Sequence, residues 1–198
     1  VRRAVTRADA ILAISQSTKN DLVQLLDAPA GKITVTHLAA DPDCRPVTDQ
    51  SRLAAVRKTY GLPERYLLFV GTLEPRKDLP TLLRAFASLG ATADACLAIA
   101  GRPGWLYQDV YELAEKLHLG PRVRFLGGVP AADLPALYSG ARLFVLPSLY
   151  EGFGMPVLEA MACGSPVICA DTSSLPEIAG DAALLFPPGD EAALAQAM

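Results

Sequence analysis

The sequence predicts an α/β fold, in which a Rossmann-like, doubly wound parallel sheet carries helices on both faces. Short apolar runs alternate with amphipathic stretches along most of the 198 residues. The runs are continuously apolar, which is typical of strands that are buried on both faces. Strand–helix alternation with short connections is the pattern of a parallel sheet that the chain crosses repeatedly.

The apolar runs are the expected strands. They lie at 11–15, 32–38, 66–71, 96–101, 123–128, 142–148, 166–170 and 183–188.

The amphipathic stretches between the runs are the expected helices. They lie at 79–90, 107–120, 131–141 and 156–164, with further helices after the first run and at the end of the sequence. In the stretch 79–90, Leu79, Leu82 and Leu83 share one face at helical spacing. Ligands of doubly wound sheets bind at the carboxyl ends of the strands. The loops that follow the strands are therefore expected to form the site.

The beginning of the sequence differs from the rest and predicts a remnant of a preceding domain. Residues 1–40 are expected to be the tail of that domain, and residues 41–51, rich in Pro and Asp, are expected to be a linker. The main Rossmann-like domain is expected at 52–198. Because the sequence ends inside an apparent helix, we expect both ends to be cut from a longer protein.

Composition excludes several classes of protein. The net charge of -3 and the lack of a basic cluster argue against a nucleic-acid partner. No run of apolar residues is long enough to span a membrane. The four cysteines lack CxxC spacing, which indicates buried thiols in a reducing cytoplasm rather than a zinc site. The Asp-Pro-Asp at 41–43 resembles a metal-binding motif, but its Pro-rich setting is typical of a turn.

The stretch YEGFGMPVLEAMACGSPV, residues 150–167, predicts an anion site at a helix start. Gly152 and Gly154 allow a tight turn and a close approach of the backbone to a ligand. Pro156 suits the first turn of a helix. The backbone amides of Phe153 to Val157 are expected to point out of the helix amino end, where phosphate is the usual anion.

Two glutamates flank this turn. A carboxylate at Glu159, about one turn inside the helix, can accept two hydrogen bonds from the vicinal diol of a ribose. Glu151, before the turn, can accept hydrogen bonds from the hydroxyls of another sugar. The alternative is that such glutamates only complement the helix dipole, but both together in this Gly-Phe-Gly-x-Pro frame favour a sugar-nucleotide ligand.

A second loop and a further helix start complete the polar pattern. Arg76 and Lys77 follow a predicted strand and can clamp a diphosphate, with Asp78 as the N-cap of the next helix. Further along, Ser174 or Thr172 is expected to cap a helix, with Glu177 as its capping-box partner.

Several stretches carry a resemblance to a known family. They are GTLEPRKDLPTLLRAF, AGRPGWLYQDV, VRFLGGVP, DLPALYSGARLFVLPSLYEGFGMPVLEAMACGSPVI and SSLPEIAGDAALLFPPGD. Together they resemble the family 4 (group 1) retaining glycosyltransferases, which have the GT-B fold. The GTLEPRK form resembles bacterial mannosyltransferases that build polysaccharides.

The resemblance implies a role for each site residue. In this family two Rossmann-like domains face a cleft, and the carboxyl-terminal one binds the nucleotide-sugar donor. Glu159 is then expected to bind the ribose and Glu151 the transferred sugar, while Lys77 meets the diphosphate. The amides of Phe153, Gly154 and Met155 are expected to meet the sugar and the phosphates. The base is expected beside Gly127 and Val129, opposite the loop that begins with Gly101 and Arg102.

One position departs from the family pattern. Many members carry Arg directly after the glycine that ends the first strand of this domain, but here Thr72 follows Gly71. Arg76, beside Lys77, can supply the missing charge. Which residue holds which phosphate is therefore open.

The expected function is that of a retaining hexosyltransferase that uses Glu151, Arg76 and Lys77 at its reaction centre. Mannose from GDP-mannose is the expected donor, a saccharide or lipid-linked saccharide the acceptor, and neither a metal nor another cofactor is expected. The resemblance implies a cytoplasmic protein that works near the inner membrane face through its acceptor domain. This chain alone is expected to bind donor weakly and to transfer nothing.

Two other functions compete with this one. A non-catalytic nucleotide-sugar-binding module of the same fold stays open. A Rossmann dehydrogenase is disfavoured, because no G-x-G-x-x-G follows an early strand.

Overall fold

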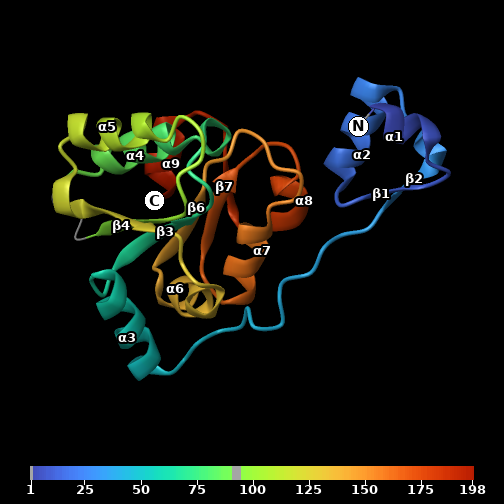
Figure 1. Ribbon diagram of the computed structural model, residues 1–198. Coiled ribbons are helices and arrows are strands. Elements are labelled where there is room, and N and C mark those ends of the chain that lie inside the picture. The colour runs from blue at the N-terminus through green and yellow to red at the C-terminus, as the bar shows by residue number, and fades with distance from the viewer. Residues whose placement is uncertain (1, 91–94) are drawn as a thin grey trace.

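The computed structural model describes residues 2–90 and 95–198 and consists of two units joined by an extended segment (Figure 1). The small N-terminal unit contains two parallel strands, β1 (Ile11–Ala13) and β2 (Ile33–Val35). Two helices accompany them, α1 (Arg2–Arg7) and α2 (Gln16–Leu26). The extended segment then leads to the larger unit, which carries the predicted sheet.

The larger unit is built on six parallel strands in the order β5-β4-β3-β6-β7-β8. Their bounds are Tyr66–Val70 for β3, Cys96–Ala100 for β4, Val123–Gly127 for β5, Leu143–Leu146 for β6, Val167–Ala170 for β7 and Leu184–Phe186 for β8. The chain winds outward from β3 to β5, returns to β6 beside β3, and winds outward again to β8. The predicted doubly wound sheet is confirmed, and its topological switch point lies between β3 and β6.

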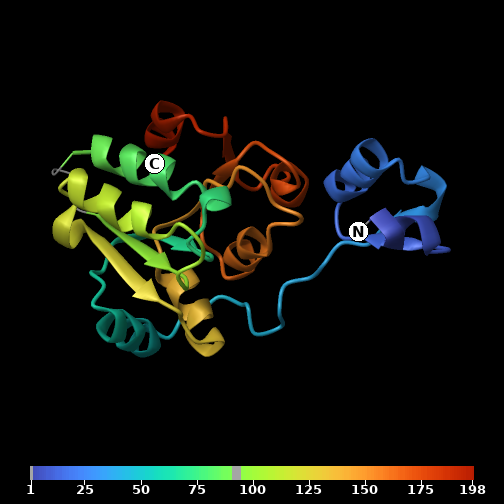
Figure 2. The ribbon, with the colours of Figure 1, turned by 45° about the horizontal axis from the view of Figure 1, so that its top comes forward.

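Helices cover both faces of this sheet (Figures 1 and 2). Helices α4, α5 and α9 pack together on one face, and α3, α6 and α7 lie on the other. Their bounds, with that of the short helix α8, are Gln50–Tyr60 for α3, Leu79–Ser88 for α4, Gln108–Lys116 for α5, Leu134–Gly140 for α6, Met155–Ala162 for α7, Leu175–Ala179 for α8 and Glu191–Ala197 for α9.

Element ends differ from the predictions where the backbone turns. The helix predicted at 107–120 ends at Lys116, because His118 takes a left-handed conformation with φ of 52°. The helix predicted at 131–141 begins with a 3₁₀ turn, Ala131–Asp133. Helix α3 begins at Gln50, inside the predicted linker, because the Asp49 side chain caps it.

One strand departs from the expected burial on both faces. In β8, Leu184 is 59% exposed and Leu185 is 38% exposed. The prediction was wrong for this strand because β8 is the edge strand of the sheet, with a neighbouring strand, β7, on one side only.

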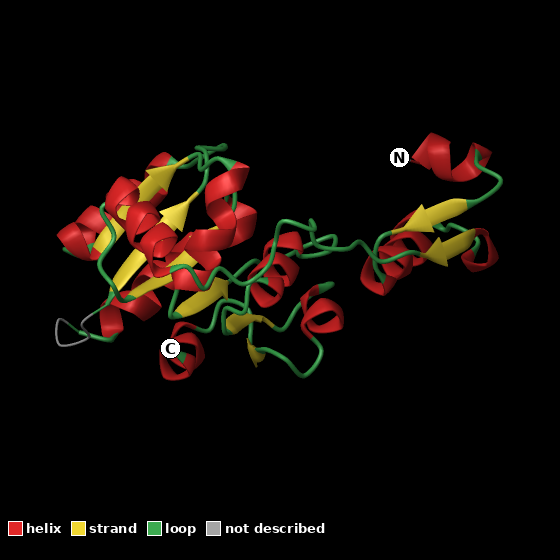
Figure 3. Ribbon diagram, turned by 90° about the horizontal axis from the view of Figure 1, so that it is seen from below, coloured by secondary structure: helices red, strands yellow, loops and turns green. Residues whose placement is uncertain are grey.

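The two units have separate apolar cores. The central strands β3 and β4 supply fully buried residues such as Leu68, Phe69 and Leu97 to the large core. The small unit has its own cluster, made by Val5, Ala13, Ala28 and Ile33. Figure 3 shows the two strands of the small unit apart from the large sheet. Within 2–90 and 95–198, every helix falls short of the length and apolar character needed to cross a bilayer.

Candidate functional site

The carboxyl ends of β3, β4 and β5 pack closely against one another. The amide of Gly71 donates to the carbonyl of Ala100 at 2.9 Å, and the amide of Gly101 donates to the carbonyl of Gly127 at 2.8 Å. A Cβ atom on Gly101 would lie 1.8 Å from the carbonyl oxygen of Gly71. Backbone packing therefore requires a glycine at position 101, in addition to the ligand contact that the sequence predicted.

The loops at this edge touch one another through their side chains. Arg102 packs across the β5 loop, since a Cβ atom on Gly128 would meet its side chain at 3.0 Å. Thr72 lies against Gly104 in the same way. Val129 is half-buried, whereas Arg102 and Thr72 are exposed. The structure thus brings Gly71, Thr72, Gly101, Arg102, Gly127 and Val129 together at the carboxyl ends of the strands, while their contact with a ligand stays a prediction.

A short turn after β3 places the two predicted cations. Residues Pro75–Lys77 form a 3₁₀ turn, and Asp78 follows with φ of 47°. The Asp78 side chain accepts from the amide of Thr81, which confirms it as the N-cap of α4. The turn directs Lys77 inward, where it is only 6% exposed, while Arg76 stays half-exposed.

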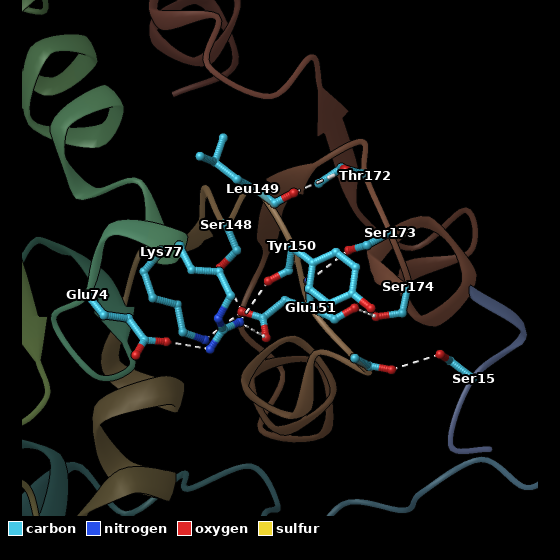
Figure 4. A network of polar contacts seen from close by, with 12 residues as sticks. Ser15, Glu74, Lys77, Ser148, Leu149, Tyr150, Glu151, Thr172, Ser173 and Ser174 are labelled. Atoms are coloured by element: carbon cyan, nitrogen blue, oxygen red, sulfur yellow. Dashed lines mark hydrogen bonds and ion pairs between the residues drawn. The ribbon is translucent and has the colours of Figure 1, made fainter. Parts of the chain in front are cut away.

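Glu151 is the centre of the polar network at the switch point (Figure 4). Its Oε1 accepts from Lys77 Nζ at 2.5 Å and from Ser148 Oγ at 2.7 Å, and its Oε2 accepts from Arg76 at 2.9 Å. Arg76 also donates to Glu74. Burial would raise the pKa of Glu151, but the charge and hydrogen bond of Lys77 hold that pKa below its usual value.

The backbone of Glu151 is held by two serines from the loop between β7 and α8. Its amide donates to Ser173 Oγ at 2.8 Å, and Ser174 Oγ donates to its carbonyl at 2.9 Å. The expected capping box is wrong, because α8 has no side-chain cap hydrogen bond: Ser174 Oγ donates to the Glu151 carbonyl, and Thr172 Oγ1 donates to the Leu149 carbonyl. Glu177, its supposed partner, reaches the small unit instead, where it accepts from the amides of Gln16 and Ser17.

The amino end of α7 faces the same edge. Gly154 precedes this helix with φ of 103°, a conformation that favours glycine. The expectation for amides 153–157 needs a correction: Pro156 has no N–H group, and the Val157 amide donates to the Gly154 carbonyl at 2.9 Å. In the part of the chain that the structure describes, the amides of Phe153, Gly154 and Met155 have no protein acceptor.

Glu159 lies within α7, and its side chain shares no hydrogen-bond partner with that of Glu151 among the described residues. It accepts from the Tyr138 hydroxyl at 2.9 Å, and burial raises the pKa of Glu159. It opens on a pocket of about 670 Å³ whose other walls are the segment 41–49, Arg52 and the start of α6.

At 41–43 the Asp41 carboxylate accepts from the Asp43 amide at 2.9 Å, which confirms the predicted turn.

Three members of this site were missed by sequence reasoning. Ser148 and Glu74 hold the ion-pair network, and Tyr138 holds Glu159. For Ser148 a signal existed, since it is a polar residue at the end of an apolar strand. No local pattern pointed to Tyr138, because its contact with Glu159 depends on how α6 packs against α7.

Comparison with known proteins points to one family. Residues 55–198 match the family described as Glycosyl transferases group 1. The O-antigen chain mannosyltransferase B of Escherichia coli is 38% identical over 192 residues, which cover 96% of this chain and 50% of that protein.

Solved structures agree as well. Anabaena HepE in complex with UDP-glucose has a TM-score of 0.88 at 25% identity, covering 98% of this chain and 54% of that chain. The sucrose-phosphate synthase of Thermosynechococcus elongatus has a TM-score of 0.85 at 29% identity, covering 99% and 49% respectively. The chain spans about half the length of these relatives and has the fold of the corresponding part of GT-B glycosyltransferases. Because the family match extends over most of its residues, the chain belongs to the glycosyl transferases of group 1.

Proposed function

We propose that this chain is the donor-binding part of a retaining glycosyltransferase that transfers mannose from GDP-mannose to a saccharide or lipid-linked saccharide. The observation that carries the proposal is the meeting of Lys77, Arg76 and Glu151 at the switch point between β3 and β6. Ligands of doubly wound sheets bind at that point. Family membership supports the reaction class.

The diphosphate of the donor is assigned to the two cations and the α7 amino end. An ammonium has three N–H donors, and Glu151 takes one from Lys77, so two remain for phosphate oxygens. Arg76 also keeps donors beyond those given to Glu74, Tyr150 and Glu151. The amides of Gly154 and Met155 and the dipole of α7 add further attraction for an anion.

The two glutamates are assigned to hydroxyl groups of the donor. A carboxylate offers about four acceptor positions, and the three donors on Glu151 leave room for one sugar hydroxyl. Glu159 accepts one bond, from Tyr138, and opens on the pocket, which leaves it able to receive a ribose diol. The size of the pocket suits a nucleoside.

The proposed chemistry needs no nucleophile from the protein. The bond between the anomeric carbon and the diphosphate oxygen breaks, and negative charge grows on the leaving phosphate. Lys77 and Arg76 stabilise that charge where it develops. The acceptor hydroxyl attacks the same face of the sugar and passes its proton to the leaving phosphate. Glu151 is tied by three hydrogen bonds, which suits a positioning carboxylate better than a nucleophile.

The choice of mannose and of the acceptor rests on relatives. The Escherichia coli relative is named for O-antigen chain mannosylation. The Anabaena structure holds UDP-glucose, so the base and the sugar are the points that need a direct test.

The test is calorimetric titration of the chain with GDP-mannose, UDP-glucose, UDP-N-acetylglucosamine and NAD. The variants are Lys77→Ala and Glu159→Ala, with Lys116→Ala, a change at an exposed surface lysine, as the matched control. We expect binding of GDP-mannose alone, weakened at least tenfold by both site changes and unaffected by the control. Binding of NAD that neither site change weakens would overturn the proposal, and selective binding of a UDP-sugar would correct the donor.

A further inference from the structure

The small unit contacts the larger unit through hydrogen bonds rather than through a shared apolar core. The two cores are separate clusters, and the segment 41–49 between the units forms neither helix nor strand. The contacts across the boundary lie close to Glu151. Several of these contacts use a carboxylate as the acceptor, and hydrogen bonds to charged groups contribute more than neutral ones, so docking depends on the charged acceptors at the boundary.

Glu177 on α8 makes several of these contacts with its one carboxylate. Its carboxylate accepts from the amide of Gln16 at 2.8 and 2.9 Å, from the amide of Ser17 at 3.2 Å, and contacts His37 Nε2 at 2.6 Å. Gln16 and Ser17 form the first turn of α2, where amides have no acceptor within the helix. The negative charge also lies at the positive end of the α2 dipole.

The other contacts hold both neighbours of Glu151. Ser15 Oγ and Thr18 Oγ1 donate to the carbonyl of Gly152 at 2.7 and 3.1 Å. The hydroxyl of Tyr150 donates to Asp21 at 2.5 Å. Figure 4 shows the bond from Ser15 beside the network that holds the Glu151 carboxylate. The loop 150–152 is thus held by α2 on one side and by Ser173 and Ser174 on the other.

We propose that Glu177 is a positioning residue, which latches the small unit onto the donor-binding unit and so fixes the loop that carries Glu151. The carboxylate holds the amino end of α2, and the docked α2 holds Gly152 and Tyr150. When the latch opens, the loop loses its support on the α2 side. The consequence for catalysis rests on the proposed function, in which Glu151 contacts the transferred sugar.

Residue-resolved amide hydrogen exchange by NMR tests the latch without any ligand. In Glu177→Ala, we expect the amides of Gln16 and Ser17 to exchange about tenfold faster or more, since they lose a charged acceptor. The amide of Glu151 is expected to exchange faster as well, because its loop is released. Glu115→Ala, a change at an exposed glutamate on α5, is the matched control.

Amides inside the small unit separate undocking from unfolding. The Thr18 amide donates to Ser15 Oγ, and the Thr36 amide donates to the Ala13 carbonyl. Both are expected to keep their wild-type rates in Glu177→Ala. Unprotected Gln16 and Ser17 amides in the wild type would overturn the latch. An unchanged Glu151 amide, with Gln16 and Ser17 released, would overturn the positioning role.

A binding measurement then connects the latch to the sugar. We expect Glu177→Ala to lower the affinity for the sugar-nucleotide that the wild type binds. The affinity for the matching nucleoside diphosphate is expected to fall less, because Glu151 is assigned to the sugar. Glu177→Gln keeps an acceptor and is expected to lie between the wild type and Glu177→Ala. Equal weakening of both ligands would contradict the positioning role. If the wild type binds no sugar-nucleotide, the proposed function fails, while the exchange rates still decide the latch.

Discussion

The ammonium of Lys77 lies 2.5 Å from Oε1 of Glu151, although 74 positions separate the two residues in the sequence. They meet because β3 and β6 are neighbours at the switch point of the sheet. Both side chains are more than nine-tenths buried. An opposite charge that is this close and this well shielded from solvent stabilises the carboxylate. Removal of one partner leaves the charge of the other buried and uncompensated.

Loss of Lys77 is therefore expected to destabilise the protein. We expect Lys77→Ala to lower the free energy of unfolding by about 3 to 5 kcal/mol, as for other broken buried pairs. Urea denaturation at pH 7 measures this. Lys116→Ala removes a cation from an exposed pair with Glu112 and is expected to change stability by less than about 0.5 kcal/mol. Equal effects of the two changes would refute the importance of the buried pair.

The depressed pKa of Glu151 predicts a pH dependence with a definite sign. Its folded pKa lies below its ordinary value of 4.5, so its stabilising contribution is present above that pH and is lost as the pH falls through the folded pKa. Glu151→Gln is expected to be less stable than the wild type at pH 7. The gap in melting temperature is expected to narrow as the pH is lowered toward 3. A gap that stays constant would show that the carboxylate is not held ionised by its neighbours.

Glu159 is expected to behave in the opposite way. Burial raises its folded pKa, so its contribution is favourable below its ordinary pKa and is lost as the pH rises through the raised one. At pH 7 the buried carboxylate opposes folding, and Glu159→Gln is expected to melt no lower than the wild type while it loses donor affinity. Thermal melts at pH 7 and calorimetry check the two parts. A marked fall in melting temperature would argue that Glu159 has a structural role.

Tyr138→Phe separates the hydrogen bond from the burial of Glu159. The change removes the O–H donor and leaves the ring, which is fully buried. We expect a loss of about 1 kcal/mol in unfolding free energy at pH 7, because a buried acceptor loses its partner. At pH 4, where Glu159 is protonated more readily, the loss is expected to shrink. Urea titrations of the variant and the wild type at both pH values provide the comparison.

Gly101 is expected to tolerate no side chain. A Cβ atom there would lie 1.8 Å from the Gly71 carbonyl, so Gly101→Ala must push apart the ends of β3 and β4. We expect a loss of about 3 kcal/mol or more. At Gly31 a Cβ atom would meet nothing within 4 Å, which makes Gly31→Ala the matched control. The prediction fails if denaturation midpoints of the two variants agree.

Much of the fold could be predicted from the sequence because its signals are local. Continuous apolar runs mark strands that are covered on both faces, and this holds for β3, β4 and β6. Gly154 and Pro156 mark the start of α7, and Asp78 marks the start of α4. Neighbouring residues alone decide these features. The edge position of β8 has no local signal, and its burial was predicted wrongly.

The site was only partly predictable, because its residues come from different loops. The pattern of residues pointed to Arg76, Lys77 and Glu151 as candidates, but it contained no information that Glu151 accepts from both cations. Glu177 shows the limit most clearly. Its local spacing predicts a capping box, whereas the structure aims it at the amino end of α2, about 160 positions away.

The sequence by itself determined the strand–helix alternation, the starts of several helices and the chemical character of the loops at the strand ends. Each depends on side chains a few positions apart, whose spacing is set by the backbone geometry of one element. Only the tertiary structure decided that β6 lies beside β3, that Glu151 pairs with Lys77, and that Glu177 joins the small unit to the large one. These contacts depend on strand order and on the docking of separate units, which many distant residues set together.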